Sequence, residues 1–142
     1  MAGESTYAFG MLVRLTPTSQ GGRATPLLGG AGPEVRFTYR PNWGLPQMTP
    51  PDQTGAPVLA FSAQHILPGD QVRVVIVPPY PQMVAEWGQV AIGDALPMYE
   101  GSRVCGHGRV LWRRDTHLPV PEPDEQRFRT WVLDPSTPAE PD

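Results

Sequence analysis

The chain has 142 residues, of which 11 are Lys or Arg and 14 are Asp or Glu, so its formal net charge is −3. This length fits one compact domain with tails. Every basic residue is Arg, which excludes Schiff-base lysine chemistry and the lysine-containing phosphate loop of many nucleotide hydrolases. The charge balance also lacks the strongly basic footprint of many nucleic-acid-binding domains.

Gly (15) and Pro (19) are frequent, but together they stay below the proportion of about 25–30% that is typical of low-complexity chains. No long stretch keeps a helical apolar repeat, whereas short β-branched runs alternate with Gly and Pro clusters. We therefore expect an all-β fold, a small and mostly antiparallel β-barrel over residues 7–114 that follows an N-terminal tail, residues 1–6. The expected strands are residues 11–15, 34–39, 58–62, 71–77, 89–92 and 103–112.

The segments between and after these strands have distinct compositions. Residues 40–57 contain five prolines, so we expect an exposed loop with Trp43 as its only large anchor. Residues 67–70, Leu-Pro-Gly-Asp, have the chemistry of a β-turn. Residues 115–142 form an acidic, Pro-rich extension, in which 119–125 is an extended linker. Residues 128–133 can dock on the domain, and residues 135–142 are expected to be disordered.

A single cysteine, Cys105, excludes an internal disulfide and a multi-cysteine zinc site, and it favours a reducing compartment. The N-terminus lacks the basic and apolar regions of a secretory signal. The longest apolar run, residues 74–77, is far shorter than the ~20 residues of a membrane helix. We expect a soluble, cytoplasmic protein without a membrane partner.

Few residues suggest chemistry. The three histidines, His65, His107 and His117, stand at no recognisable metal-ligand spacing. Cys105 lies two residues before His107, a spacing that suggests a thiol nucleophile and its base, but the glycines around His107 favour a bend and a structural cysteine. We therefore predict no catalytic residue, no metal and no cofactor, and a protein that is not an enzyme.

The arginines suggest a binding role. Enough of them lie in or beside the expected strands to form a local phosphate-contacting stripe, with Trp43, Trp87 and Trp112 as stacking or packing surfaces. The alternative is that most arginines simply solvate outward strand faces. The residues concerned are Arg36, Arg40, Arg73, Arg103, Arg109, Arg113 and Arg114.

An ordered set of short motifs resembles the C-terminal β-barrel, domain three, of bacterial elongation factor Tu. The motifs are residues 21–26 (GGRATP), 52–55 (DQTG), 67–70 (LPGD), 91–92 (AI) and 100–108 (EGSRVCGHG). Their order is the family's order, and the match covers about three quarters of the chain. Two departures look like turn insertions, at residues 40–51 and 93–99. The GTPase domain and second barrel of the family have no counterpart, so we expect no nucleotide hydrolysis.

The resemblance also implies a surface. In the family this barrel contacts the T-stem backbone of aminoacyl-tRNA, and the matching positions here are Glu34, Thr54, Glu100 and Gly101. Glu34 stands where the family usually has glutamine, and Gly32 where it usually has arginine. Both differences weaken contact with phosphate, because a carboxylate is added and a cation is lost.

Two functions follow. The first is a non-catalytic binding module that contacts tRNA or a translation-machinery protein, through Arg23, Thr54, Glu100, Gly101 and Arg103, with Glu34 at the edge of the surface. The alternative is a protein–protein interaction domain without RNA binding, which uses the Trp43 loop and the acidic tail.

Overall fold

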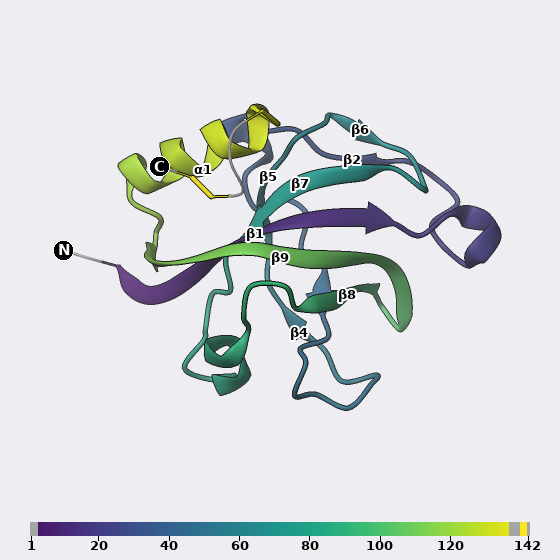
Figure 1. Cartoon of the computed structure of the whole chain (residues 1–142), viewed down its shortest axis with the longest axis horizontal. Helices are drawn as coiled ribbons and strands as arrows, with labels where there is room; N and C mark the ends of the chain where they lie inside the picture. The colour runs from purple at the N-terminus through teal and green to yellow at the C-terminus, as the bar shows by residue number, and fades with distance from the viewer. Residues whose placement is uncertain (1–2, 137–139, 142) are drawn as a thin grey trace.

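Nine β-strands and one α-helix make up the described part of this computed structural model, residues 3–136 and 140–141 (Figure 1). The strands are β1 (Glu4–Leu15), β2 (Leu27–Leu28), β3 (Asn42–Trp43), β4 (Thr54–Gly55), β5 (Val58–Phe61), β6 (His65–Ile66), β7 (Gln71–Ile76), β8 (Ala95–Glu100) and β9 (Arg103–Leu118). The helix is α1 (Glu122–Leu133), and short 3-10 helices span Thr18–Gln20, Pro33–Val35 and Ala85–Gln89.

Seven strands form one antiparallel sheet in the order β4-β3-β8-β9-β1-β7-β5, and β2 pairs with β6 separately. The expected antiparallel β character is confirmed for most of the structure, although the helix α1 is added to it. The expected barrel closure is not found, because the edge strands β4 and β5 do not pair with each other. They are instead consecutive in the chain, with only Ala56 and Pro57 between them. The sheet is therefore curled, and its two edge strands, β4 and β5, are joined by this short connection rather than by strand pairing.

The inner face of the curled sheet carries the main core. Along β1, Phe9, Met11, Val13 and Leu15 are all buried, and they pack with the buried residues Val72, Val74 and Ile76 of β7. This alternation follows from the two-residue repeat of a strand. Burial of these aliphatic and aromatic side chains stabilises the fold by about 1.5–3 kcal/mol for each of them.

The outer face of the sheet is covered at one end by α1 (Figure 1). Trp112 of β9 stacks on Phe128 and makes an edge contact with Trp131, both with ring centroids 5.3 Å apart. Gly10 makes room for this indole, since a Cβ there would lie 2.0 Å from Trp112. The expected docking of residues 128–133 is confirmed, although Leu133 itself is 61% exposed.

The expected linker at 119–125 is wrong from Glu122 onward, where α1 begins. Proline is accepted in the first helical turn, and the carboxylates of Glu122, Asp124 and Glu125 favour the positive end of the helix dipole. A segment that reads as extended from its prolines therefore forms the start of the helix.

Four expected strands are confirmed, those at 11–15, 58–62, 71–77 and 103–112, which coincide with parts of β1, β5, β7 and β9 except that β5 ends at Phe61 and β7 at Ile76. β1 already begins at Glu4 and β9 continues to Leu118, so residues 4–6 and 115–118 belong to the sheet rather than to tails. Of the segment expected to be disordered, residues 137–139 and 142 lie outside the described residues. Pro141 lies in the described part and accepts a hydrogen bond from Arg114.

Two expected strands are wrong. Residues 34–39 contain the end of a 3-10 helix and then Phe37, whose φ of 59° no regular strand allows. Residues 89–92 begin with the last residue of another 3-10 helix, Ala85–Gln89, and the strand of that region is β8, which starts at Ala95. Pro97 hides β8 in the sequence because proline usually avoids sheets. In the fold, the Pro97 carbonyl still accepts a hydrogen bond from Gly44.

Glu125 ties α1 to the turn that follows the Pro33–Val35 helix. Its carboxylate pairs with Arg36, with an Nη1–Oε1 distance of 2.7 Å, and with Arg129 one helical turn later. Burial alone would raise the pKa of Glu125, but hydrogen bonds from Arg36 and Arg129 outweigh it and hold the pKa below its ordinary value. The ionised form therefore stabilises the docked helix.

None of the described helices combines the length and the apolar content that a membrane crossing requires.

Replacing Trp131 by Ala removes a side chain that is only 1% exposed from the interface between α1 and the sheet. We expect a loss of about 3–5 kcal/mol in the free energy of unfolding, measured by urea denaturation. Leu133→Ala, in the same helix but mostly exposed, is the control and should change stability by no more than about 0.5 kcal/mol. Equal effects of the two substitutions would contradict the docking of α1.

Because the folded-state pKa of Glu125 is depressed, its contribution to stability is present above its ordinary pKa of 4.5 and is lost as the pH falls through the folded-state value. Glu125→Gln should therefore lower stability at neutral pH and reduce its fall on acidification, in urea titrations at several pH values. The exposed Glu122→Gln is the matched control. An acid response unchanged by Glu125→Gln would count against the two ion pairs.

Candidate functional site

The turn between β8 and β9 brings four of the predicted contact residues together. Glu100 and Arg103 are paired across the turn, and Gly101 between them has a φ of 63°, which favours glycine. Arg23 reaches the turn from the loop after β1 and forms an ion pair with Glu100. Gly101, Ser102 and Arg103 are exposed, so this turn presents a small polar surface.

Arg23 and Glu100 are occupied by contacts within the protein. Arg23 also donates hydrogen bonds to the carbonyls of Thr25, at 3.2 Å, and Pro26, at 3.3 Å. Glu100 accepts a second hydrogen bond from the Tyr39 hydroxyl at 2.7 Å. These contacts fix the loop after β1 against the β8–β9 turn. Both charged residues therefore position the turn. Their guanidinium and carboxylate groups are used in contacts within the protein and are not the groups that would bind a partner first.

Cys105 lies behind this network, fully buried, with its Sγ 3.9 Å from the Tyr39 hydroxyl. Burial and the nearby charge of Glu100 raise the pKa of the Cys105 thiol to about 11. Burial, Cys105 and Glu100 also raise the pKa of Tyr39 well above its usual value. The thiol is therefore protonated at neutral pH. No hydrogen bond in the described part of the chain joins it to His107, which is exposed. This arrangement does not supply an activated nucleophile.

The other predicted contact residues are more dispersed. Arg103 is exposed, and its guanidinium lies 3.5 Å from the carbonyl of Gly22. Thr54 is half-buried in β4, two strands away from β8 in the sheet, which corresponds to about 10 Å. Glu34 is exposed on a 3-10 helix, and its carboxylate lies over Gly32. Among the described residues, no hydrogen bond or ion pair joins Glu34 to the network around Glu100.

Trp43 is not an exposed anchor. It is 0% exposed, and its indole N–H donates to the carbonyl of Ala56 at 3.0 Å. β3 is held between β4 and β8, which turns the ring into the core. The expectation that Trp43 contacts a partner is therefore wrong, because the contact would require β3 to leave the sheet.

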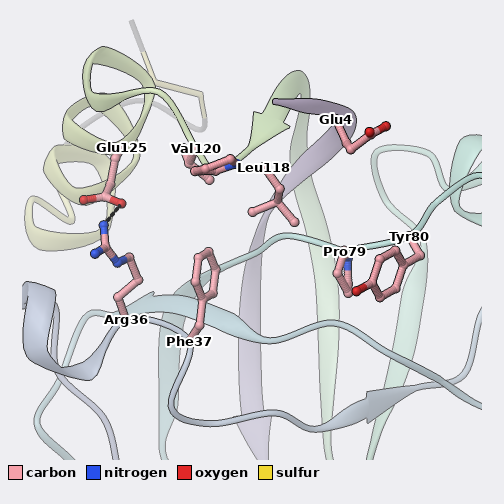
Figure 2. Close-up of a pocket in the computed structure, with 9 residues that line it drawn as sticks. Glu4, Arg36, Phe37, Pro79, Tyr80, Leu118, Val120 and Glu125 are labelled. Carbon is pink, nitrogen blue, oxygen red and sulfur yellow. Dashed lines mark hydrogen bonds and ion pairs between the residues drawn. The ribbon is translucent and has the colours of Figure 1, made fainter. Parts of the chain in front are cut away.

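Sequence reasoning missed an apolar groove on another side of the molecule. Figure 2 shows Phe37, Pro79, Tyr80 and Leu118 around a hollow of about 540 Å³, with the ion pair of Glu125 at one side. Tyr80 is 67% exposed, and Met83 in an adjoining hollow is 79% exposed. The sequence signal for this groove is the run of mostly apolar and aromatic residues at 77–84. The prolines in this run also fit an ordinary loop, so the groove was not predicted.

The described residues contain no group of three or more His, Cys, Asp or Glu side chains that could hold a metal ion.

Tyr39→Phe removes the hydroxyl that donates to Glu100 and keeps the ring. A hydrogen bond to a charged group contributes about 1.5–3 kcal/mol, so we expect a stability loss of that size in urea denaturation. Tyr80→Phe is the control, since the exposed Tyr80 hydroxyl makes no hydrogen bond to the described residues, and it should leave stability within about 0.5 kcal/mol. If Tyr39→Phe is equally silent, Tyr39 does not support the turn.

A scan against models of known protein families found no match, and a search of curated proteins found none either.

Proposed function

We propose that this protein is a non-catalytic RNA-binding module of the cytoplasm, similar to the C-terminal barrel of elongation factor Tu, and that it contacts tRNA or another component of translation. The observation that carries this proposal is the β8–β9 turn. Arg23 and Tyr39 hold Glu100 in place, so that Gly101, Ser102 and Arg103 face solvent in a fixed conformation.

The curled sheet supports the resemblance to this family of barrels. Backbone hydrogen bonds continue past the strand ends: the amide of Val58 donates to Tyr39 at 3.0 Å, and that of Ala56 donates to Pro41 at 3.3 Å. These two bonds link residues 39–41, which precede β3, to residues 56–58, which lead from β4 into β5. Such a wrapped sheet leaves few strand edges exposed, as a small barrel does.

Within this proposal the matching residues have different roles. Arg103 supplies the cation that contacts phosphate. Gly101 has no side chain, so the protein backbone of the turn can approach the phosphate closely. Thr54, two strands away, lines the hollow beside Tyr80 and Met83, so its side chain is not part of the turn surface. Arg23 and Glu100 position the turn. Glu34 disfavours phosphate and limits how far the RNA extends.

The test is a filter-binding titration with aminoacylated and deacylated tRNA over a range of salt concentrations, with the isolated barrel domain of an elongation factor Tu as reference. Arg103→Ala should weaken binding and reduce the dependence of log affinity on log salt by about one. Arg127→Ala removes the same charge from an exposed position on α1 and is the control. No tRNA binding by the wild-type protein at low salt would overturn the proposal.

A second candidate is a protein-binding domain that uses the groove of Figure 2 in place of Trp43. The exposed aromatic ring of Tyr80 and the flexible side chain of Met83 are suited to an apolar segment of a partner. Such binding should depend little on salt and should be lost in Tyr80→Ser. RNA binding has the opposite profile, since it falls steeply with salt and does not need Tyr80.

A further inference from the structure

Two rows of side chains cross the outer face of β8, β9, β1 and β7. Strand pairing fixes their members, because residues opposite each other in an antiparallel pair lie on the same face. The first row is Pro97, His107, Arg14 and Gln71, and the second is Ala95, Arg109, Leu12 and Arg73. We refer to these eight positions as the outer arginine face.

The burial pattern shows that these rows point away from the core. In β1, Met11 and Val13 alternate with Leu12 and Arg14 and belong to the inner core. The next residues along the outer face, Gly10 and its partner Trp112, lie beneath α1. Figure 1 shows α1 over one end of these strands, whereas β1 ends on the other side. The outer arginine face is thus the part of this surface that α1 leaves uncovered.

The charge of this face is of one sign. It holds Arg14, Arg73, Arg109 and His107, and no carboxylate occupies any of the eight positions. Arg14, Arg109 and His107 are exposed. In the described parts of the chain, no ion pair joins Arg14 or Arg109 to a carboxylate.

The groups at the border of the face are already engaged. Arg73 lies 4.6 Å over the Trp131 ring and donates to the carbonyl of Trp131 at 3.0 Å. These contacts hold the Arg73 side chain in place at the end of α1. Asp70 and Asp94, which precede the ends of the first and second rows, accept hydrogen bonds from the amides of Leu67 and Ala91, at 2.9 and 2.8 Å. Both carboxylates therefore stabilise turns.

We propose that the outer arginine face binds the phosphate backbone of double-stranded RNA. The planar guanidinium is the side chain best suited to two-pronged contact with phosphate. Arg14 and Arg109 come from the neighbouring strands β1 and β9, so the charges spread over a surface rather than a point. Arg73, whose guanidinium is held by the carbonyls of Trp131 and Asp134, adds positive charge at the border on β7. A polyanion is the ligand that neutralises several such charges at once.

The residues between the arginines exclude other partners. Single-stranded RNA is bound by stacking its bases mainly on large aromatic rings, and the eight positions include no Phe, Tyr or Trp, only the imidazole of His107. Protein interfaces are enriched in large apolar or aromatic anchors. The large exposed apolar residues of the described chain all lie elsewhere, at Leu28, Leu67, Tyr80, Met83, Ile92 and Leu133. A duplex, recognised through its backbone and shape, fits a face that offers cations without Phe, Tyr or Trp rings.

This inference rests on the proposed function in one respect, that the partner is RNA. It does not depend on the β8–β9 turn. Since stems of tRNA are duplexes, the face would add a second contact region to the turn, formed by the same strand, β9.

The test measures fluorescence anisotropy of a labelled, perfectly paired 20-base-pair RNA over a salt series. The double variant Arg14→Gln/Arg109→Gln should lose about two phosphate contacts, lowering the salt slope by close to 2, and weaken binding by about tenfold or more. The double variant Arg40→Gln/Arg127→Gln removes the same charge from two other exposed positions and should bind almost as the wild type. Urea midpoints establish that both variants fold.

The outcomes separate the two proposals. Loss of duplex binding in the face variant but not in Arg103→Ala supports the outer arginine face and counts against the turn. Binding of tRNA without binding of the plain duplex overturns the face and leaves the proposed function intact. Equal losses in the face variant and in the control, tighter binding of single-stranded RNA, or displacement by polyglutamate as effective as by duplex would each overturn the inference.

Discussion

The pairing of β1 with β9 is the constraint on which the rest of the structure depends. It extends from Glu4 opposite Leu118 to Leu15 opposite Gly106. It thereby pairs the first strand of the chain with the last one. Its inner side supplies the centre of the main core. Its outer side supports α1 at one end and exposes arginines at the other. Arg14 and Arg109 are placed directly by these two strands, and Arg103 by the turn that leads into β9.

The distribution of charge supports the proposed RNA binding. The chain is acidic overall, which by itself argues against RNA. However, the acidic residues are placed where they do structural work: Glu125 pairs with Arg36 and Arg129, Glu100 pairs with Arg23, and Asp124 accepts a hydrogen bond from Thr116. In the described residues, no ion pair joins Arg14 or Arg109 of the outer face to a carboxylate. A protein with a negative total charge therefore presents a local cationic surface.

The sequence predicted the strands that have a clear apolar alternation, such as 11–15 and 71–77, because alternation follows directly from burial of one face. It missed β8, where Pro97 disguises a strand whose pairing depends on β3 and β9. It also misplaced Trp43: the surrounding prolines indicate an exposed loop, and only the pairing of β3 with β8 turns the ring inward. Local composition does not contain such long-range contacts.

The candidate site was predictable to a similar extent. The motif at residues 100–103 indicated the exposed turn, but its support by Tyr39 depends on a contact between residues 61 positions apart. The stripe of arginines was expected in general terms. Its members were not, because Arg14, Arg73 and Arg109 come together only through the register of three strands.

The central claim, that the β9 side of the sheet binds RNA, is tested most directly by NMR. Amide and arginine side-chain signals of the isotopically labelled protein would be followed during titration with a short RNA stem. If this side of the sheet binds RNA, we expect chemical-shift changes at Arg14, His107, Arg109 and the Gly101–Arg103 turn, with the signals of Tyr80 and Met83 unchanged. Changes confined to the Tyr80 groove, or no change at any of these residues, would contradict it.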